Sequence, residues 1–135
     1  MFIYDPKHKQ TLPYYDAFPL TIVLGPAEGG FAGINLHYLP PLLRARFLDG
    51  LMERMTDKKY DESTRFAVSY QYLKKASTSK YIAPTYKHYL TKHVRSKFAR
   101  IPAPEWEIAT FLPAADWRKQ SGKAVYADTR RMVNG

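Results

Sequence analysis

The sequence predicts an α+β fold, because strand patterns and helix patterns occur in separate blocks along the chain. Residues 19–24 and 31–38 are rich in β-branched and aromatic side chains and are joined by a glycine-containing loop, which is typical of a β-hairpin. From residue 40 onward, apolar residues recur at steps of three and four, which indicates amphipathic helices. An alternating segment at residues 105–112 predicts a further strand. This order favours α+β over a parallel sheet with alternating helices.

Length and composition predict one folded domain covering residues 1–135. With 45% hydrophobic residues, the chain is too apolar to be disordered. It contains no cysteine, which excludes disulfides and thiolate metal sites within it. It has no signal-peptide pattern and no apolar run near the roughly 20 residues of a membrane helix. We therefore expect no membrane contact and an intracellular or virion-internal location.

The N-terminal third is expected to hold most of the strands. Residues 1–4 predict a short strand, and residues 7–13 a polar loop. Because the chain opens directly in a strand, it is compatible with a native start further upstream. His37, inside the second hairpin strand, is expected to be packed and hydrogen-bonded rather than a ligand.

The glycine-rich segment at residues 29–33 resembles a phosphate-binding loop in composition. Such loops lead into a helix, however, whereas this segment leads into a strand. We therefore expect a hairpin turn there.

Pro40 and Pro41 predict the start of the first helix, because proline is well tolerated in a first turn. Gly50, in the middle of this helix, is expected where another element approaches closely. Four charged residues are placed outside the core-facing stripe: Arg44, Arg46, Glu53 and Arg54. The predicted stripe is Leu43, Phe47, Leu48, Leu51, Met52 and Met55.

Two further helices are predicted. The second begins near Asp61 or Ser63, either of which can cap free backbone N–H groups, and ends near residue 76. The third covers residues 84–98, and its faces other than the apolar one are almost wholly basic. The apolar faces are Phe66, Tyr70 and Leu73 in the second helix, and Tyr86, Tyr89, Leu90, Val94 and Phe98 in the third.

The segment at residues 105–112 is predicted to pair with the N-terminal hairpin. The result is a small antiparallel sheet, with an SH3-like sheet as one option, packed with about three helices. Residues 116–120 predict a helical turn. Residues 123–133 fit a strand or a helix, and we favour an extended run at residues 124–126.

The net charge of +9 comes from one acid-free segment. Residues 63–104 contain no Asp or Glu and nine Lys and Arg residues, so the remaining twelve bases balance the twelve acids elsewhere. A concentrated positive field attracts polyanions, and we expect DNA or an acidic protein surface as the partner. A merely solvated, solubilising face is the alternative.

The predicted nucleic-acid-binding residues lie within this segment. Lys and Arg neutralise phosphates, and tyrosines can stack on bases. The alternative keeps the tyrosines in the core and leaves the charges simply exposed. No arginine pattern for reading guanine is visible, so binding would use the DNA backbone. The candidates are Lys74, Lys75, Lys80, Tyr86, Lys87, His88, Lys92, Arg95, Lys97 and Arg100.

No cofactor or metal site is predicted, and the chain is not expected to be an enzyme. His88 and His93 stand five residues apart in the acid-free segment, which does not match a metal-binding pair. Glu105 and Glu107 share one side of the predicted strand, and together with His37 they form the basis of a nuclease alternative. A solvated strand face or a salt bridge is the favoured explanation of the two glutamates.

Five motifs are spread over most of the chain: Tyr4-Asp5-Pro6-Lys7, Leu12-Pro13-Tyr14-Tyr15-Asp16, Phe18-Pro19-Leu20, Gly33-Ile34-Asn35-Leu36-His37-Tyr38-Leu39-Pro40 and Lys87-His88-Tyr89-Leu90. Together they resemble a family of small proteins of T4-like tailed bacteriophages, sometimes labelled DNA end protector proteins. The resemblance implies a non-enzymatic, DNA-associated protein in the virion or host cytoplasm that binds the DNA backbone or DNA ends. The alternative is a structural head, neck or tail protein that docks on an acidic partner subunit. No catalytic residue is carried over.

Overall fold

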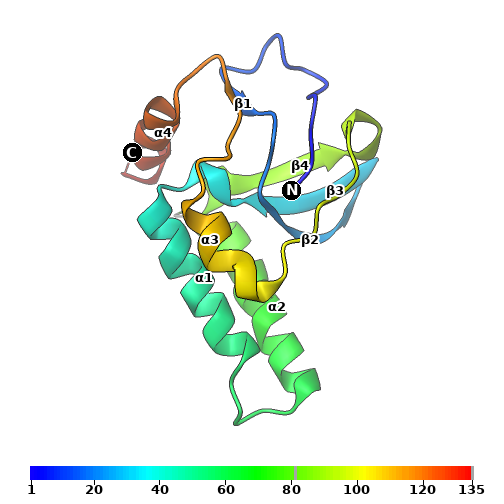
Figure 1. The fold of residues 1–135 in the computed structure, drawn as a ribbon, viewed down its shortest axis with the longest axis vertical. Coiled ribbons are helices and arrows are strands. Elements are labelled where there is room, and N and C mark those ends of the chain that lie inside the picture. Colours follow the sequence, from blue (N-terminus) through cyan, green and yellow to red (C-terminus); the bar gives the residue numbers. More distant parts are fainter. Residues whose placement is uncertain (81, 135) are drawn as a thin grey trace.

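The structure, a computed structural model, describes residues 1–80 and 82–134, with side chains as far as Met132. The predicted α+β class is confirmed: within these residues four α-helices accompany two small antiparallel sheets. The helices and the larger sheet form two layers, and a long helical hairpin extends away from the sheet (Figure 1). Each of the described helices is too short or too polar to cross a lipid bilayer.

The larger sheet has three strands in the order β2-β3-β4. The predicted hairpin is confirmed as β2 (Thr21–Ala27) and β3 (Gly30–Asn35), with Gly29 at φ 72° in the turn. β2 carries a bulge between Val23 and Gly25, and Pro26 lies opposite Phe31. β3 is shorter than predicted, because the Asn35 side chain accepts a hydrogen bond from the His37 N–H and turns the chain into η1 (Leu36–Tyr38).

The third strand, β4 (Tyr86–Leu90), corrects the predicted helix at residues 84–98. Pro84 opens only a short turn, η2 (Ala83–Thr85), and the chain then pairs with β3 in the register Phe31↔Tyr89. The open edge of β3 supplies backbone hydrogen-bond partners for β4. Tyr86 and Tyr89 lie on opposite sides of the strand, one exposed and one buried, which suits a strand whose two sides differ. A second 3-10 turn, η3 (Thr91–His93), follows β4.

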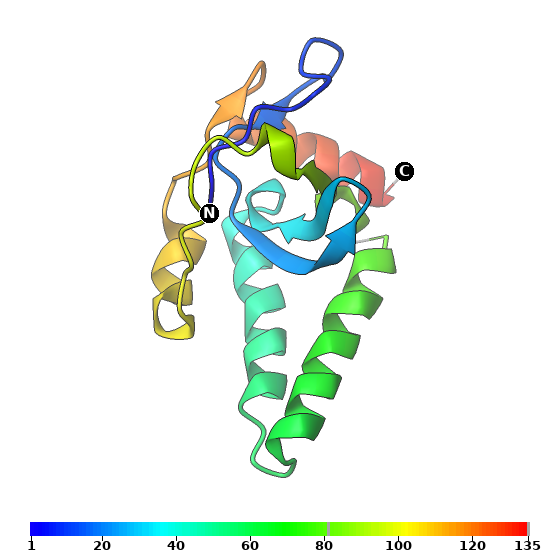
Figure 2. The same ribbon diagram turned by 90° about the vertical axis from the view of Figure 1, so that its right-hand side faces the viewer.

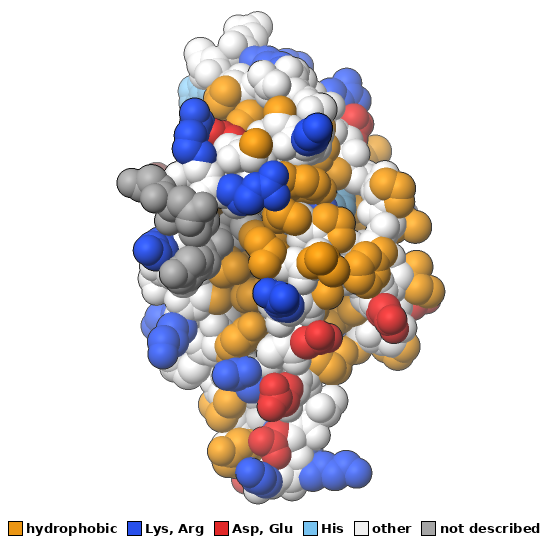
Figure 3. All heavy atoms as spheres, turned by 90° about the vertical axis from the view of Figure 1, so that its left-hand side faces the viewer, with side chains coloured by type: hydrophobic (Ala, Val, Ile, Leu, Met, Phe, Trp, Pro, Cys, Tyr) orange, Lys and Arg blue, Asp and Glu red, His pale blue; other side chains and the backbone are white. Residues whose placement is uncertain are grey.

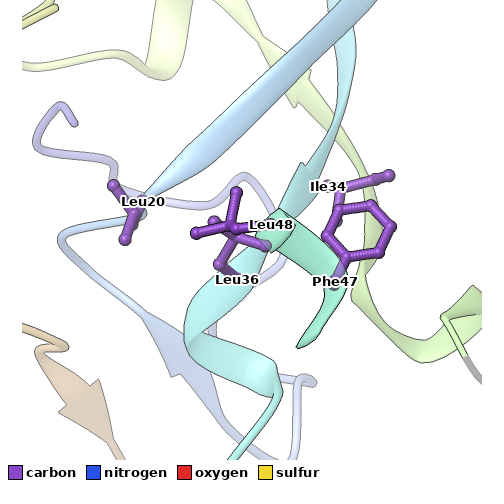
Figure 4. Close-up of a cluster of buried hydrophobic side chains, with 5 residues drawn as sticks. All are labelled: Leu20, Ile34, Leu36, Phe47 and Leu48. Atoms are coloured by element: carbon purple, nitrogen blue, oxygen red, sulfur yellow. The ribbon is translucent and has the colours of Figure 1, made fainter. Parts of the chain in front are cut away.

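The two faces of this sheet bury different clusters. One face packs on the helices through Leu20, Ile34, Leu36, Phe47 and Leu48 (Figure 4). The opposite face packs on a mainly aromatic cluster, in which Val94 joins Phe2, Tyr4, Phe31 and Tyr89. The sheet therefore lies between helices α1 and α2 on one side and the N-terminal segment on the other, as Figure 2 shows from the side.

Helices α1 (Pro41–Met55) and α2 (Glu62–Thr78) confirm the first two predicted helices. The Asp61 side chain caps α2 by accepting a hydrogen bond from the Thr64 N–H at 2.7 Å. The close approach predicted at Gly50 is also confirmed, since a Cβ there would lie 2.5 Å from the Tyr72 hydroxyl.

The buried faces of both helices differ in part from the prediction. In α1, Leu43 is 42% exposed, and Met55 is exposed as well. Arg44, predicted to lie outside, is only 3% exposed, because its guanidinium donates hydrogen bonds to buried carbonyls. In α2, Phe66 and Tyr70 are exposed, because this helix turns the face with Tyr72, Leu73 and Ala76 toward the core.

The predicted strand at residues 105–112 is wrong, and so is its pairing with the hairpin. This segment forms η4 (Ala103–Glu105) and α3 (Trp106–Phe111). Trp106, Ala109 and Thr110 have helical spacing and lie on the packed side of α3. In so short a segment, a helical pattern of apolar residues is difficult to distinguish from the alternating pattern of a strand. The structure does not confirm an SH3-like sheet.

Two other C-terminal predictions are wrong. Residues 116–120 hold a short strand, β5 (Trp117–Arg118), which pairs with β1 (Tyr15–Asp16), rather than a helical turn. Residues 124–126 are not extended, because they belong to α4 (Gly122–Asn134), whose buried Val125 and Thr129 are four residues apart.

The predicted strand at residues 1–4 is reduced to a single bridge, Tyr4↔Val94. The segment does run beside residues 94–99: the Arg95 N–H donates to the Ile3 carbonyl and the Ala99 N–H to the Met1 carbonyl. The Ile3 N–H, however, donates to the Ser96 hydroxyl instead of a backbone carbonyl. The side-chain bond interrupts the backbone ladder, so no regular strand forms.

Replacing Gly30 by alanine should destabilise the protein, because the new Cβ would lie 1.8 Å from the carbonyl oxygen of Tyr89. That oxygen belongs to the β4 backbone, so β3 and β4 would have to separate locally, at a cost of about 1–3 kcal/mol or more. Gly25→Ala is the matched control, since nothing lies within 4 Å of its Cβ position. Urea unfolding compares the two variants, and equal losses would contradict this β3–β4 packing.

Candidate nucleic-acid interface

The ten predicted binding residues do not share one helix surface. Lys74 and Lys75 lie on α2 and line a shallow groove with Arg54. Lys80 follows α2, and Lys97 and Arg100 belong to the segment that runs beside the N-terminus. The remaining five gather around β4 and η3: Tyr86, Lys87, His88, Lys92 and Arg95. The predicted basic helix at residues 84–98 is therefore wrong, because residues 86–90 form the strand β4.

The strand geometry sends the β4 side chains to opposite faces of the sheet. Tyr86 and His88 are exposed, and a ring nitrogen of His88 lies 2.7 Å from the Glu28 carbonyl oxygen. Lys87 alternates with them and lies on the same face as Tyr89, where it is largely buried. The prediction treated these residues as one basic set, but only Lys87 points under the N-terminal segment.

A pocket of about 440 Å³ lies on this face, between the N-terminal segment and β4. Ligand pockets in proteins span about 300–1,000 Å³, so its size suits a small organic ligand or one nucleotide. We call it the Lys87 pocket. The lining residues used below are Lys7, His8, Tyr14, Tyr15, Tyr38 and Lys87.

Lys87 is the cationic centre of this pocket. Its Nζ lies 3.9 Å from the centroid of the Tyr38 ring, which is a cation–π contact. Opposite Lys87 in the β3–β4 register is Gly33, where a Cβ would lie 2.3 Å from the Thr21 side chain of β2. Burial lowers the pKa of Lys87 to about 8. Within residues 1–80 and 82–132, no carboxylate lies within ion-pair distance of it.

Asp16 also lines the pocket, but its carboxylate is occupied by other partners. Oδ1 accepts hydrogen bonds from the N–H groups of Phe18 and Asp116, at 2.9 and 3.0 Å. Oδ2 accepts one from Asn35 Nδ2 at 3.1 Å and lies 2.6 Å from His37 Nδ1. Burial alone would raise the pKa of Asp16, but the His37 contact and the other hydrogen bonds outweigh it and lower that pKa. Asp16 is therefore a structural anion that pairs with His37 and forms no ion pair with Lys87.

His37 confirms its predicted packed and hydrogen-bonded role, since its side chain is fully buried against Asp16. An ionised carboxylate only accepts hydrogen bonds, so the Nδ1 atom carries the proton. The nuclease alternative loses its geometry as well, because Glu105 lies in η4 and Glu107 in α3 instead of on one strand. Among the described residues, no three His, Asp or Glu side chains are grouped to hold a metal ion.

A group of basic side chains, which we call the basic rim, lies beside the pocket, and two of its members, Lys7 and His8, line it. It joins two segments far apart in sequence, because the Asp5 N–H donates to the His93 carbonyl at 3.1 Å next to the Tyr4↔Val94 bridge. An acidic residue, Asp5, lies among these basic side chains, with its carboxylate 3.0 Å from Lys9 and 3.9 Å from Arg95. The hydrogen bond from Lys9 is the main cause of the lowered pKa of Asp5. The rim consists of Lys7, His8, Lys9, Lys92 and Arg95.

The N-terminal half of the rim was missed in the sequence, where residues 7–13 were assigned only to a polar loop. Lys119 anchors this loop, since its ammonium donates hydrogen bonds to the carbonyls of Lys9 and Leu12. A local signal was present: three basic side chains precede the pair Tyr14 and Tyr15, and basic residues close to aromatic ones are typical of grooves that bind single strands. The contact of this loop region with residues 92–95 could not be predicted from the sequence, because it depends on pairing between segments far apart in the chain.

Substituting Lys87 by methionine should raise the free energy of unfolding near pH 7 by about 1–2 kcal/mol, because it removes a cation whose burial is unfavourable. The folded-state pKa of about 8 lies below the ordinary 10.5, so the penalty is complete below pH 8 and is relieved as the pH rises toward 10.5. Urea unfolding near pH 7 and near pH 10 measures this gain and its decline. Lys74→Met on exposed α2 is the control, and an equal gain there would contradict the assignment to burial.

Comparison with known proteins agrees with the resemblance found in the sequence. The family model of the phage T4 terminal DNA protecting protein matches residues 1–132. The comparisons with curated proteins and with solved structures found no match. Because the family model covers nearly the whole sequence, this chain belongs to the phage T4 terminal DNA protecting protein family.

Proposed function

We propose that this protein binds the ends of phage DNA without chemical change to the DNA and shields them, with the basic rim as its main DNA contact. The observation that carries the proposal is the contact between Asp5 and His93, which brings the cations of residues 7–9 and 92–95 together beside a pocket that Lys7 and His8 line. The family is named for the protection of terminal DNA, which supports DNA as the partner. The virion and the host cytoplasm are the locations where such DNA ends occur.

The rim supports binding to the DNA backbone rather than to particular bases. Lysine and histidine side chains neutralise phosphates and release counterions, and this contribution is independent of sequence. The two lysines that carry the argument are Lys7 and Lys92, both exposed and without a carboxylate partner among the described residues. A protein seated on the last phosphates of a duplex blocks the access of a nuclease by its volume alone.

The double variant Lys7→Gln, Lys92→Gln should bind DNA more weakly and with a smaller salt dependence. Each lost phosphate contact lowers the slope of log K against log salt by about 0.9 on duplex DNA. The matched control is Lys74→Gln, Lys75→Gln, which removes the same charge from α2. An internally labelled duplex, titrated at several salt concentrations, measures both.

The control pair is expected to keep the wild-type slope. Equal slopes for the two double variants would reject the rim as the DNA contact. An unchanged slope in both would place the contact elsewhere on the protein.

A second candidate function is docking on a structural protein of the phage particle. The observation that favours it is a group of exposed apolar side chains on and after α3, namely Ile108, Phe111 and Leu112. Figure 3 views the side of the molecule that carries α1 and α4 and shows hydrophobic side chains gathered across its middle, whereas Lys and Arg are dispersed. Such gatherings mark protein contacts more often than nucleic-acid contacts.

In this case Phe111→Ser, Leu112→Ser would abolish co-sedimentation with DNA-free phage particles while the salt-dependent DNA binding remains. Circular dichroism checks that α3 is retained in the variant. Co-sedimentation that persists at the wild-type level would exclude this surface as the docking site.

A further inference from the structure

We propose that the Lys87 pocket receives one unpaired nucleotide at a DNA end, with its phosphate on the Lys87 ammonium and its base against the tyrosines of the pocket. This inference rests on the proposed binding of DNA ends and names the part of the DNA that the pocket takes. A duplex presents paired bases and cannot enter a pocket of about 440 Å³ as a whole. A single nucleotide has the size of the ligands that such pockets hold.

The charge of the pocket supports an anionic ligand. The oxygens of Asp16, the carboxylate in the lining, are occupied by four hydrogen-bond donors, and among the described residues no carboxylate forms an ion pair with Lys87. Lysine is a common phosphate ligand because its ammonium acts as a compact point charge. Tyr38 holds the ammonium in place through the cation–π contact at 3.9 Å, and the lowered pKa of Lys87 agrees with a cation that lacks its counter-charge.

The aromatic side chains of the pocket are fixed by their own contacts. The Tyr14 hydroxyl donates a hydrogen bond to Asp128 at 2.6 Å, and its ring lies 6.3 Å from the Trp117 ring and 6.1 Å from the Tyr38 ring. Tyr15 is tied to the short sheet through its pairing with Arg118. Rigid aromatic rings offer stacking surfaces that accept every base, since each base has a π-face.

The polar groups of the pocket do not favour one base over another. Asn35, which also lines the pocket, accepts hydrogen bonds from the N–H groups of Leu20 and His37 and donates to Asp16. With its amide occupied in this way, it is not available to read a base edge. The pocket should therefore recognise an unpaired nucleotide by charge and stacking, with little preference for sequence.

The test measures the affinity of the full chain for duplexes with different ends. One end of each duplex is closed by a hairpin loop, and the open end is blunt or carries a short 5′ or 3′ overhang, with or without a terminal phosphate. A dumbbell closed at both ends reports binding that needs no end. The wild type should bind one class of overhang about tenfold more tightly than the blunt end, as expected for one stacked base and one phosphate contact. The preferred polarity and the effect of the terminal phosphate identify which phosphate reaches Lys87.

Lys87→Met should remove this preference and keep the affinity for the blunt duplex within about twofold, because the rim is intact. Since this variant is expected to be more stable than the wild type, misfolding does not explain a loss. Lys87→Arg restores a cation and should recover part of the preference. Lys92→Gln, at a rim residue outside the pocket lining, gives the opposite pattern: weaker binding to all ends, with the preference retained.

A preference for overhangs that survives in Lys87→Met would overturn the inference, and so would equal wild-type affinity for blunt and overhanging ends. Both results leave the proposed function standing as long as open duplexes bind better than the dumbbell. Equal binding of dumbbell and open duplexes would instead reject the recognition of ends, so the two failures are distinguishable.

Discussion

The fold depends on two buried charged side chains, Asp16 and Arg44, whose hydrogen bonds meet at η1. Arg44 Nε donates to the carbonyls of Leu36 and Leu39, both at 2.7 Å, and the rest of its guanidinium reaches Thr110 in α3 and Tyr126 in α4. Asp16 contacts the other side of η1 by accepting a hydrogen bond from His37. It also accepts a hydrogen bond from the N–H of Asp116, 100 residues away in sequence. Buried charges are tolerated when their hydrogen bonds are complete. These two residues therefore hold the C-terminal elements on a small sheet that could not bury them by apolar contact alone.

Lys87 contrasts with these two residues, although all three are charged and largely buried. The polar atoms of Asp16 and Arg44 form hydrogen bonds within the protein. The ammonium of Lys87, in contrast, makes a cation–π contact with the ring of Tyr38. Natural sequences depart from local consistency mainly at functional sites, where stability is given up for binding. The same side chain therefore weakens the free protein and supplies the charge for a ligand.

Local signals in the sequence were sufficient for the β2–β3 hairpin and the first two helices. The glycine turn, the proline start of α1, the Asp61 cap and the close approach at Gly50 each depend on neighbours within a few residues. β4 was not predictable in this way, because its helix-like spacing is overridden by pairing with β3 across more than 50 residues. Short segments such as α3 are ambiguous for the same reason: six residues fit an alternating pattern and a helical one.

The candidate site, too, was predictable only where it depends on local sequence and not where it depends on long-range contacts. The acid-free segment correctly indicated that positive charge is concentrated in the chain, but charge alone did not distinguish the inward Lys87 from the outward His88. That distinction requires the strand. The loop with Lys7 joined the site only through the contact of Asp5 with His93, which no local pattern encodes.

The bulge in β2 bears on how several copies of this protein can coexist. β2 is an edge strand, and an open edge can pair with the same edge of a second molecule. Here the bulge between Val23 and Gly25 breaks the regular spacing, and Pro26 has no N–H to donate. An incoming strand would therefore find an interrupted ladder along this edge. This edge of the sheet is therefore a poor template for joining crowded molecules into extended β-sheet fibres.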